Sequence, residues 1–215
     1  MVVSEDLGFN PPRRALQRVY ERLLAAYGPQ HWWPGDSPFE VMVGAVLTQN
    51  TAWRNVERAI ANLEAAGALT PTAVASLPPA ELAALIRPAG YFNVKARRLQ
   101  AFCRFLLEAG GVDALGARPT EALRHALLAV HGIGPETADD ILLYAFARPV
   151  FVIDAYTRRL LRRLGLAGGD EGYEALRQGI EREPGPPLLP GQLPGAEQAA
   201  QVGIALGGLC QQRQR

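Results

Sequence analysis

The sequence has few cysteines, few lysines and no long apolar run, and each shortage excludes a class of protein. Its 215 residues include two cysteines, too few for a disulfide framework or a four-cysteine metal or iron–sulfur site within the chain. No apolar run approaches the roughly 20 residues that a membrane span needs, and residues 1–12 lack the pattern of a signal peptide. We therefore expect a cytoplasmic protein without membrane contact.

Lysine is almost absent: Lys95 is the only lysine among 22 basic residues. Any mechanism that needs a lysine amine therefore has one candidate. The formal net charge of +1 does not suggest nucleic acid by itself. Hydrophobic residues make up 48% of the chain, enough for the cores of one large or two small domains.

Hydrophobic periodicity predicts an all-α protein. Apolar residues recur at helical spacing in segments 15–27, 39–47, 56–63, 95–108, 120–130, 136–147 and 155–164. Pro71 and Pro78–Pro79 suit the first turns of short helices. Strand alternation is essentially absent. Near the end, residues 184–194 predict an irregular, proline-rich loop, and residues 197–209 a final helix.

Two glycines, Gly132 and Gly134, separate two of the predicted helices. Such a pair permits a tight turn with positive φ and lets another backbone approach closely. Pro135 suits the first helical position, so the N–H groups of the following turn stay free to bind phosphate. The hairpin therefore suits a DNA backbone without reading its sequence. An ordinary corner between helices is the alternative.

The stretch from Leu127 to Arg159 resembles the helix-hairpin-helix and glycine/proline–aspartate signature of the endonuclease III (HhH-GPD) superfamily of base-excision DNA glycosylases. Gly90–Ala96 and Val46–Thr51 are similar to two further segments of that superfamily, the second being its polar wedge. The resemblance covers residues 15–166. It implies a two-lobed helical fold, with a six-helix barrel at 39–148 and a second lobe from 1–38 plus 149–215.

The resemblance also implies roles for individual residues. Asp154 matches the essential aspartate, whose carboxylate would stabilise an oxocarbenium-like transition state and orient water; capping the helix that follows is its structural alternative. Asp139 and Asp140 are interpreted as solvated acids. The residues expected to contact double-stranded DNA are Gln49 and Asn50, which would fill the gap left by a flipped nucleotide or else cap a helix, together with Lys95, Gly132, Ile133, Gly134, Glu136, Thr137 and Arg158.

Two departures from the superfamily pattern narrow the activity. Glu136 occupies the position of the lysine that forms a Schiff base in bifunctional members, which predicts a monofunctional enzyme with little lyase activity. Cys210 matches the first ligand of the usual four-cysteine cluster, but the chain has no further ligands. We expect a monomer with no iron–sulfur cluster, no required cofactor and no side-chain metal site. A monovalent cation on hairpin carbonyls would leave no side-chain signature.

All three tryptophans lie between residues 32 and 53, which indicates a core cluster or a base pocket. The arrangement resembles the endonuclease-III-like 3-methyladenine DNA glycosylases, in which Trp32, Trp33, Pro34 and Trp53 would hold the flipped base. A cationic alkylated purine gains roughly 0.5–2 kcal/mol against such rings. The C-terminal active-site lysine of those enzymes is missing. The alternatives are a G:T or G:U mismatch thymine/uracil glycosylase and a non-catalytic lesion-binding protein.

Overall fold

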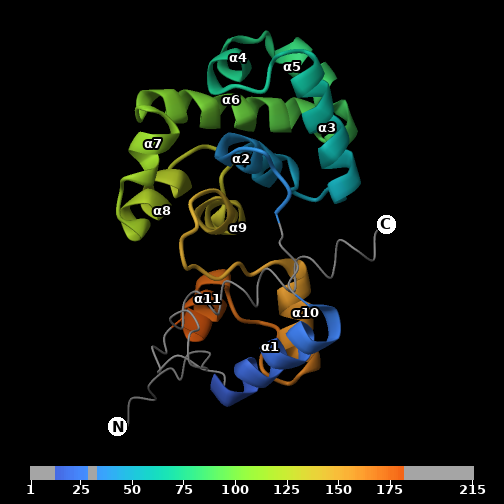
Figure 1. The fold of residues 1–215 in the computed structure, drawn as a ribbon, viewed down its shortest axis with the longest axis vertical. Coiled ribbons are helices and arrows are strands. Elements are labelled where there is room, and N and C mark those ends of the chain that lie inside the picture. Colours follow the sequence, from blue (N-terminus) through green and yellow to red (C-terminus); the bar gives the residue numbers. More distant parts are fainter. Residues whose placement is uncertain (1–12, 29–32, 182–215) are drawn as a thin grey trace. The chain divides into compact units, whose positions relative to one another are not determined.

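The computed structural model describes residues 13–28 and 33–181, which belong to two compact units (Figure 1). Residues 33–148 form one unit, and the described residues before 33 and after 148 form the other. Both units are helical, and the described residues contain no strand, so the all-α prediction is confirmed. None of the helices in these two ranges has the length and apolar character that crossing a membrane requires.

The unit of residues 33–148 is assembled around two helices, α2 (Pro38–Leu47) and α6 (Phe92–Glu108). Helices α4 and α5 pack along one side of α6 and α2 along the other (Figure 1). The remaining elements of this unit are α3 (Trp53–Ala65), α4 (Pro71–Ser76), α5 (Pro79–Leu85), the short 3₁₀ helix η1 (Arg87–Ala89), α7 (Gly111–Gly116), α8 (Thr120–Leu128), α9 (Pro135–Asp140) and the π-helical segment η2 (Ile141–Ala145).

Helix α2 is the central element of this unit because it is apolar on every side. Phe39 and every residue from Val41 to Leu47 are buried. Its start is well defined: the Ser37 hydroxyl accepts the Glu40 N–H at 3.2 Å, and Pro38 occupies the first turn. Burial on all sides fixes the direction in which the chain leaves α2, and therefore the position of the polar loop that follows.

The second unit contains α1 (Arg13–Tyr27), α10 (Ala155–Arg163) and α11 (Tyr173–Glu181). Its core is made of Tyr20, Phe151, Ile153, Leu161 and Leu176. The extended segment 150–153 is buried without a strand partner, and α11 supplies two of its hydrogen bonds. The Phe151 N–H donates to Glu181 Oε1 at 2.7 Å, and the Ile153 N–H donates to the Tyr173 hydroxyl at 3.4 Å.

Three expectations about the elements need comment. The single helix predicted over 136–147 is wrong, because α9 gives way to π-helical geometry at Ile141 and the regular helix ends there. Helices α7 and α11 were not expected, since their short segments carry glycines and loop-like flanks. The loop predicted at 184–194 and the helix predicted at 197–209 lie outside the described residues.

Candidate active site

The polar loop after α2, residues 48–52, is called the wedge loop here. Asn50 is exposed at its tip and has a φ of +52°, a left-handed conformation that asparagine tolerates better than most residues. The Thr51 hydroxyl donates to the Ala89 carbonyl at 2.6 Å, which ties the loop to η1. The loop therefore presents Asn50 outward while its far end is held in place.

Lys95 lies beneath the wedge loop, and the expectation that it contacts DNA is wrong. Its side chain is 2% exposed, and its ammonium donates to Leu47 O at 2.7 Å, Thr51 Oγ1 at 2.5 Å and Ala89 O at 2.8 Å. These three bonds use every donor that an ammonium has. Burial, and to a lesser degree the nearby Arg98, lower the pKa of Lys95 to about 8. Lys95 thus joins α2, the wedge loop and η1.

The hairpin between α8 and α9 has the expected positive φ at one of its two glycines. Gly132 has a φ of +90°, whereas Gly134 has a φ of −92° in an extended conformation. Gly134 caps α9, and Pro135 begins it as expected. The Ile133 side chain is 5% exposed and its N–H donates to the Val130 carbonyl at 3.0 Å. Ile133 therefore anchors the hairpin through its side chain and its N–H, and its contact with DNA stays a prediction.

Gln49 connects the wedge loop to the hairpin. Its amide nitrogen donates to the Gly132 carbonyl at 3.2 Å and to the Thr137 hydroxyl at 2.8 Å, while Arg98 donates to its amide oxygen. These contacts serve neither of the two roles expected for Gln49, which were to fill a gap in DNA and to cap a helix. In this conformation Gln49 holds two DNA-binding candidates together, and Asn50 is the side chain left at the surface.

Asp139 and Asp140 are buried, so their interpretation as solvated acids is wrong. Asp139 is fully buried and accepts two hydrogen bonds from Arg124, at 2.7 Å from Nε and 3.1 Å from Nη2. This bidentate pair joins α8 to α9, the two helices of the hairpin. Glu136, by contrast, is exposed in the first turn of α9.

Trp33 and Trp53 form an aromatic cluster with Tyr144, which the sequence did not point to. The Trp33 and Trp53 centroids lie 5.1 Å apart with their planes at 83°, and Trp33 lies 5.0 Å from Tyr144. Gly44 of α2 makes room for both indoles, since an added Cβ would lie 3.0 Å from Trp33 Nε1 and 3.3 Å from Trp53 Cη2.

The cluster as it lies has no slot for a base between the two indoles, because perpendicular rings in contact leave no stacking space. Trp53 is 5% exposed and donates from Nε1 to Glu57 at 2.8 Å, whereas Trp33 is only partly buried and Pro34 is exposed. Trp53 thus forms the fixed wall of the cluster. Trp32 lies outside the described residues.

Asp154 belongs to the other unit and caps α10 as its structural alternative predicted. Its Oδ1 accepts the Thr157 N–H at 2.7 Å, and its side chain is partly exposed. One carboxylate oxygen is therefore oriented by the start of α10, and among the described residues no hydrogen bond is found to the other. Arg158 donates to the Glu171 carbonyl at 2.8 Å, so its guanidinium is partly committed within its own unit.

The 215-residue sequence has two cysteines, fewer than the four thiolates that hold an iron–sulfur cluster. Cys103 is buried in α6, where burial raises the pKa of its thiol to about 12, and Cys210 lies outside the described residues. Two cysteines cannot supply four thiolates. The described part of the chain also contains no group of three or more His, Cys, Asp or Glu side chains that could hold a metal ion.

Tyr91 is a surface candidate that sequence reasoning missed. It is 73% exposed, has a φ of +44° and directly precedes α6. It lies two residues after Ala89, whose carbonyl accepts bonds from Thr51 and Lys95. A large aromatic side chain held outward on left-handed backbone is uncommon. Its position in the segment Gly90–Ala96 was the signal that could have identified it.

The model of the HhH-GPD superfamily base excision DNA repair proteins matches residues 43–184 of this chain. The match includes the wedge loop, Lys95, the hairpin and Asp154. The chain therefore belongs to the HhH-GPD superfamily of base excision DNA repair proteins, as its motifs predicted. Activity as a DNA glycosylase in base excision repair follows from this membership.

Individual relatives agree with this assignment. MJ1434 of Methanocaldococcus jannaschii, whose name assigns it provisionally to the DNA repair glycosylases, is 43% identical over 78% of this chain and 77% of its own length. Endonuclease III of Thermotoga maritima is 33% identical over 60% of this chain and 57% of its own length.

Among solved structures, the 3-methyladenine DNA glycosylase MagIII of H. pylori, bound to 1,N6-ethenoadenine, has a TM-score of 0.76. It is 29% identical, and the match covers 94% of this chain and 97% of that one. An endonuclease III–DNA complex has a TM-score of 0.74 at 21% identity, covering 91% and 84% of the two chains, which shows a shared fold. The predicted HhH-GPD glycosylase fold is thus confirmed.

Proposed function

We propose that this protein is a monofunctional DNA glycosylase that hydrolyses the N-glycosidic bond of alkylated purines of the 3-methyladenine type. The cluster of Trp33, Trp53 and Tyr144 carries the proposal, because electron-rich rings favour a cationic base. The likeness to MagIII, solved with a modified adenine bound, supports the same substrate class. An alkylated purine is also a good leaving group, so a pocket of rings without a strong acid suffices.

The partly buried Trp33 is the movable member of this pocket, and Trp53 is the fixed one. Admitting a flipped base beside Trp53 requires Trp33 to turn away from its edge-to-face contact. The base would then stack on an indole whose own nitrogen is held by Glu57. Trp32 and Pro34 complete the proposed pocket.

Asp154 is proposed as the catalytic carboxylate. The oxocarbenium-like transition state carries positive charge on the sugar, which a nearby carboxylate stabilises while orienting the attacking water. The helix-capping bond to Thr157 leaves this chemistry available, because it fixes the orientation of one oxygen and keeps the group as an acceptor.

Water is proposed as the nucleophile because no lysine amine is available to replace it. The only lysine of the sequence, Lys95, is buried with all three donors bonded to Leu47, Thr51 and Ala89. Glu136 stands at the exposed position where bifunctional relatives carry the Schiff-base lysine, and a carboxylate cannot form that intermediate. The product is an intact strand with an abasic site.

Double-stranded DNA is proposed to engage the unit of residues 33–148 through two features. Asn50 and Tyr91, both exposed on left-handed backbone, would enter the duplex where the nucleotide leaves it. The first turn of α9 would hold a phosphate by backbone N–H groups near Gly134, and a monovalent cation on the hairpin carbonyls would help. We propose that the protein acts as a monomer without an iron–sulfur cluster.

Mass analysis of the free bases released from methylated duplex DNA tests the proposal. We expect methylated purines in the supernatant and alkali-sensitive sites in the DNA, with no strand nicking before alkali and no borohydride-trapped adduct. Opening of G:T or G:U duplexes without purine release would support the mismatch glycosylase instead. A purified protein that binds alkylated DNA but releases no base at all would be a lesion-binding protein.

The Asp154→Asn variant tests the catalytic assignment. We expect the rate of base release to fall by about 10²-fold or more, the usual order for losing one electrostatic stabiliser, while DNA affinity is retained. Asparagine also caps helices, so the fold is kept. Asp170→Asn, at an exposed position of the same unit, is the matched control. Unchanged purine release by Asp154→Asn would refute the mechanism.

A further inference from the structure

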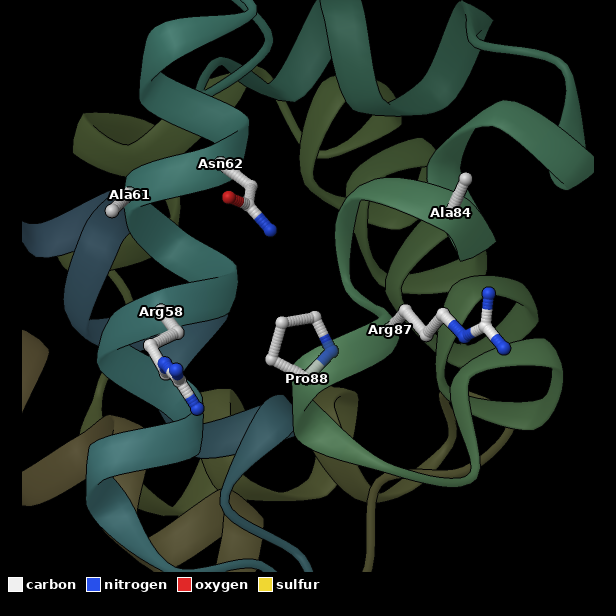
Figure 2. A pocket seen from close by; sticks show the side chains of 6 residues that line it. All are labelled: Arg58, Ala61, Asn62, Ala84, Arg87 and Pro88. Carbon is white, nitrogen blue, oxygen red and sulfur yellow. The ribbon is translucent and has the colours of Figure 1, made fainter.

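A groove lies on the surface of the unit of residues 33–148, between α3 and η1 (Figure 2). It is an open surface hollow of about 620 Å³. Figure 2 shows Pro88 between the two sides, with the Asn62 side chain directed toward the opening from α3. The lining residues are Arg58, Ala61, Asn62, Ala84, Arg87 and Pro88.

Two arginines give the groove its charge. Arg58 and Arg87 are both exposed, and within the described residues neither guanidinium has a carboxylate partner. Arg87 lies 5.8 Å over the Phe92 ring, which restrains its side chain without neutralising it. Arginine is the side chain best suited to phosphate, because its planar fork donates two parallel hydrogen bonds.

The other lining residues of the groove are small or uncharged. Ala61 and Ala84 leave the groove open, and the Asn62 amide donates to the Leu85 carbonyl at 2.8 Å, which fixes the spacing of α3 and α5. An open groove lined by two arginines suits an extended anionic ligand. Nothing in the lining would distinguish one base from another.

Both sides of the groove lie close in the chain to the wedge loop or to Ala89, which the loop bonds. Pro88 precedes Ala89, whose carbonyl accepts bonds from Thr51 and from the Lys95 ammonium. On the other side, Arg58 lies five residues into α3, which begins at Trp53 immediately after the loop. A duplex entered by Asn50 would therefore pass over or beside this surface.

We propose that the groove binds the sugar–phosphate backbone of the duplex flanking the lesion, with Arg58 and Arg87 each on a phosphate. The proposal rests on the proposed function, because it takes DNA as the ligand. It adds a contact outside the hairpin, the wedge loop and the aromatic cluster, and that contact positions the duplex without reading its sequence.

Measuring DNA affinity against salt tests the proposal with the double variant Arg58→Ala/Arg87→Ala. Each lost phosphate contact removes about 0.9 from the slope of log K against log salt, so we expect the slope to fall by about 2. Relative to 1 M salt, where this electrostatic contribution vanishes, the affinity near 0.1 M salt should drop by roughly 60-fold. Arg22→Ala/Arg104→Ala removes two exposed arginines from α1 and α6 and is the control with equal net charge.

A second pair of variants tests the groove without touching the arginines. Ala84→Glu places a carboxylate in the groove and should weaken binding several-fold, whereas Ala114→Glu, exposed on α7, should not. The DNA affinities of Arg58→Ala/Arg87→Ala and of its control Arg22→Ala/Arg104→Ala should differ only on long duplexes. The difference should vanish on duplexes that carry little DNA on either side of the lesion.

Equal slopes and affinities for the groove variants and their controls would overturn the proposal, and would leave an acidic peptide or solvent as the occupant of the groove. This failure is distinguishable from failure of the proposed function. If only the groove proposal fails, the wild-type protein still releases methylated purines. If the proposed function fails, the wild-type protein releases none, while the salt slopes of the groove variants and their controls still differ.

Discussion

At the scale of single residues, Lys95 shows how strongly the fold changes what a side chain can do. In the sequence it is the one amine for nucleophilic chemistry and a candidate for phosphate contact. In the structure its three bonds to Leu47, Thr51 and Ala89 place a cation under the wedge loop. Its charge therefore organises the backbone of the site rather than meeting the substrate.

The pH dependence of folding should report the buried ammonium. The pKa of Lys95 is about 8 in the folded chain and about 10.5 when unfolded, so the unfolded chain binds more protons between these values and stability rises with pH there. The full rise is at most about 3 kcal/mol at 1.36 kcal/mol per pKa unit. Urea unfolding from pH 7.5 to 10.5 should show it, and Lys95→Met should abolish it.

Cys103 acts in the opposite direction and must be removed from this test. Burial raises the pKa of its thiol from about 9 to about 12, so the folded chain binds more protons and stability falls as pH rises through that window. The comparison is therefore made between Cys103→Ala and Cys103→Ala/Lys95→Met. An identical rise in both proteins would contradict the role assigned to Lys95.

At the scale of elements, the hairpin is held by contacts from outside itself. The buried Arg124–Asp139 pair joins α8 to α9, and Gln49 bonds the Gly132 carbonyl from the wedge loop. Arg98 of α6 holds Gln49 in turn and lies against Gly132, where an added Cβ would be 2.3 Å from Arg98 Cγ. The turn therefore needs glycine for both its backbone and its neighbour.

The two hairpin glycines should respond differently to alanine. Gly132→Ala meets left-handed strain of about 1–2 kcal/mol as well as the Arg98 side chain, so we expect a loss of that size or more in the free energy of unfolding. Gly134→Ala has a negative φ and open space, so it loses only the small preference of an N-cap for glycine and should cost clearly less than Gly132→Ala. Denaturant unfolding of both variants measures the difference.

An Arg98→Ala background separates the two causes. Removing the Arg98 side chain should recover part of the Gly132→Ala cost, because the clash is relieved while the backbone strain persists. Equal destabilisation by Gly132→Ala and Gly134→Ala would contradict the account of the hairpin.

At the scale of the whole molecule, the chain forms two units that each have a core of their own. The unit containing Asp154 is built on the cluster of Tyr20, Phe151, Ile153, Leu161 and Leu176. The unit containing the hairpin is built on the fully apolar α2. The residues proposed to hold the base and the carboxylate proposed to act on it thus depend on separate cores.

Leu161→Ala should loosen one unit selectively. Truncating a buried leucine costs about 2–5 kcal/mol, and Leu161 is 3% exposed in the cluster around α10. By hydrogen exchange we expect faster exchange in α1, α10 and α11 with little change in α2 and α6. Leu164→Ala, 47% exposed at the end of α10, is the control. Uniform loss of protection in both units would show that they unfold together.

Helical periodicity was enough to predict the all-α fold and most helices, because amphipathic spacing depends on local sequence alone. The same holds for Pro135 at the start of α9 and for Asp154 as the cap of α10, whose partners lie within four residues. The superfamily followed from short motifs of this kind.

Burial and long-range contacts were decided only by the tertiary structure. Asp139 looked solvated because its partner Arg124 lies on another helix, and Lys95 looked exposed because its acceptors come from α2, the wedge loop and η1. Tyr144 joined the tryptophans across more than 90 residues of chain. Such pairings depend on which elements pack together, and a local sequence pattern does not determine that packing.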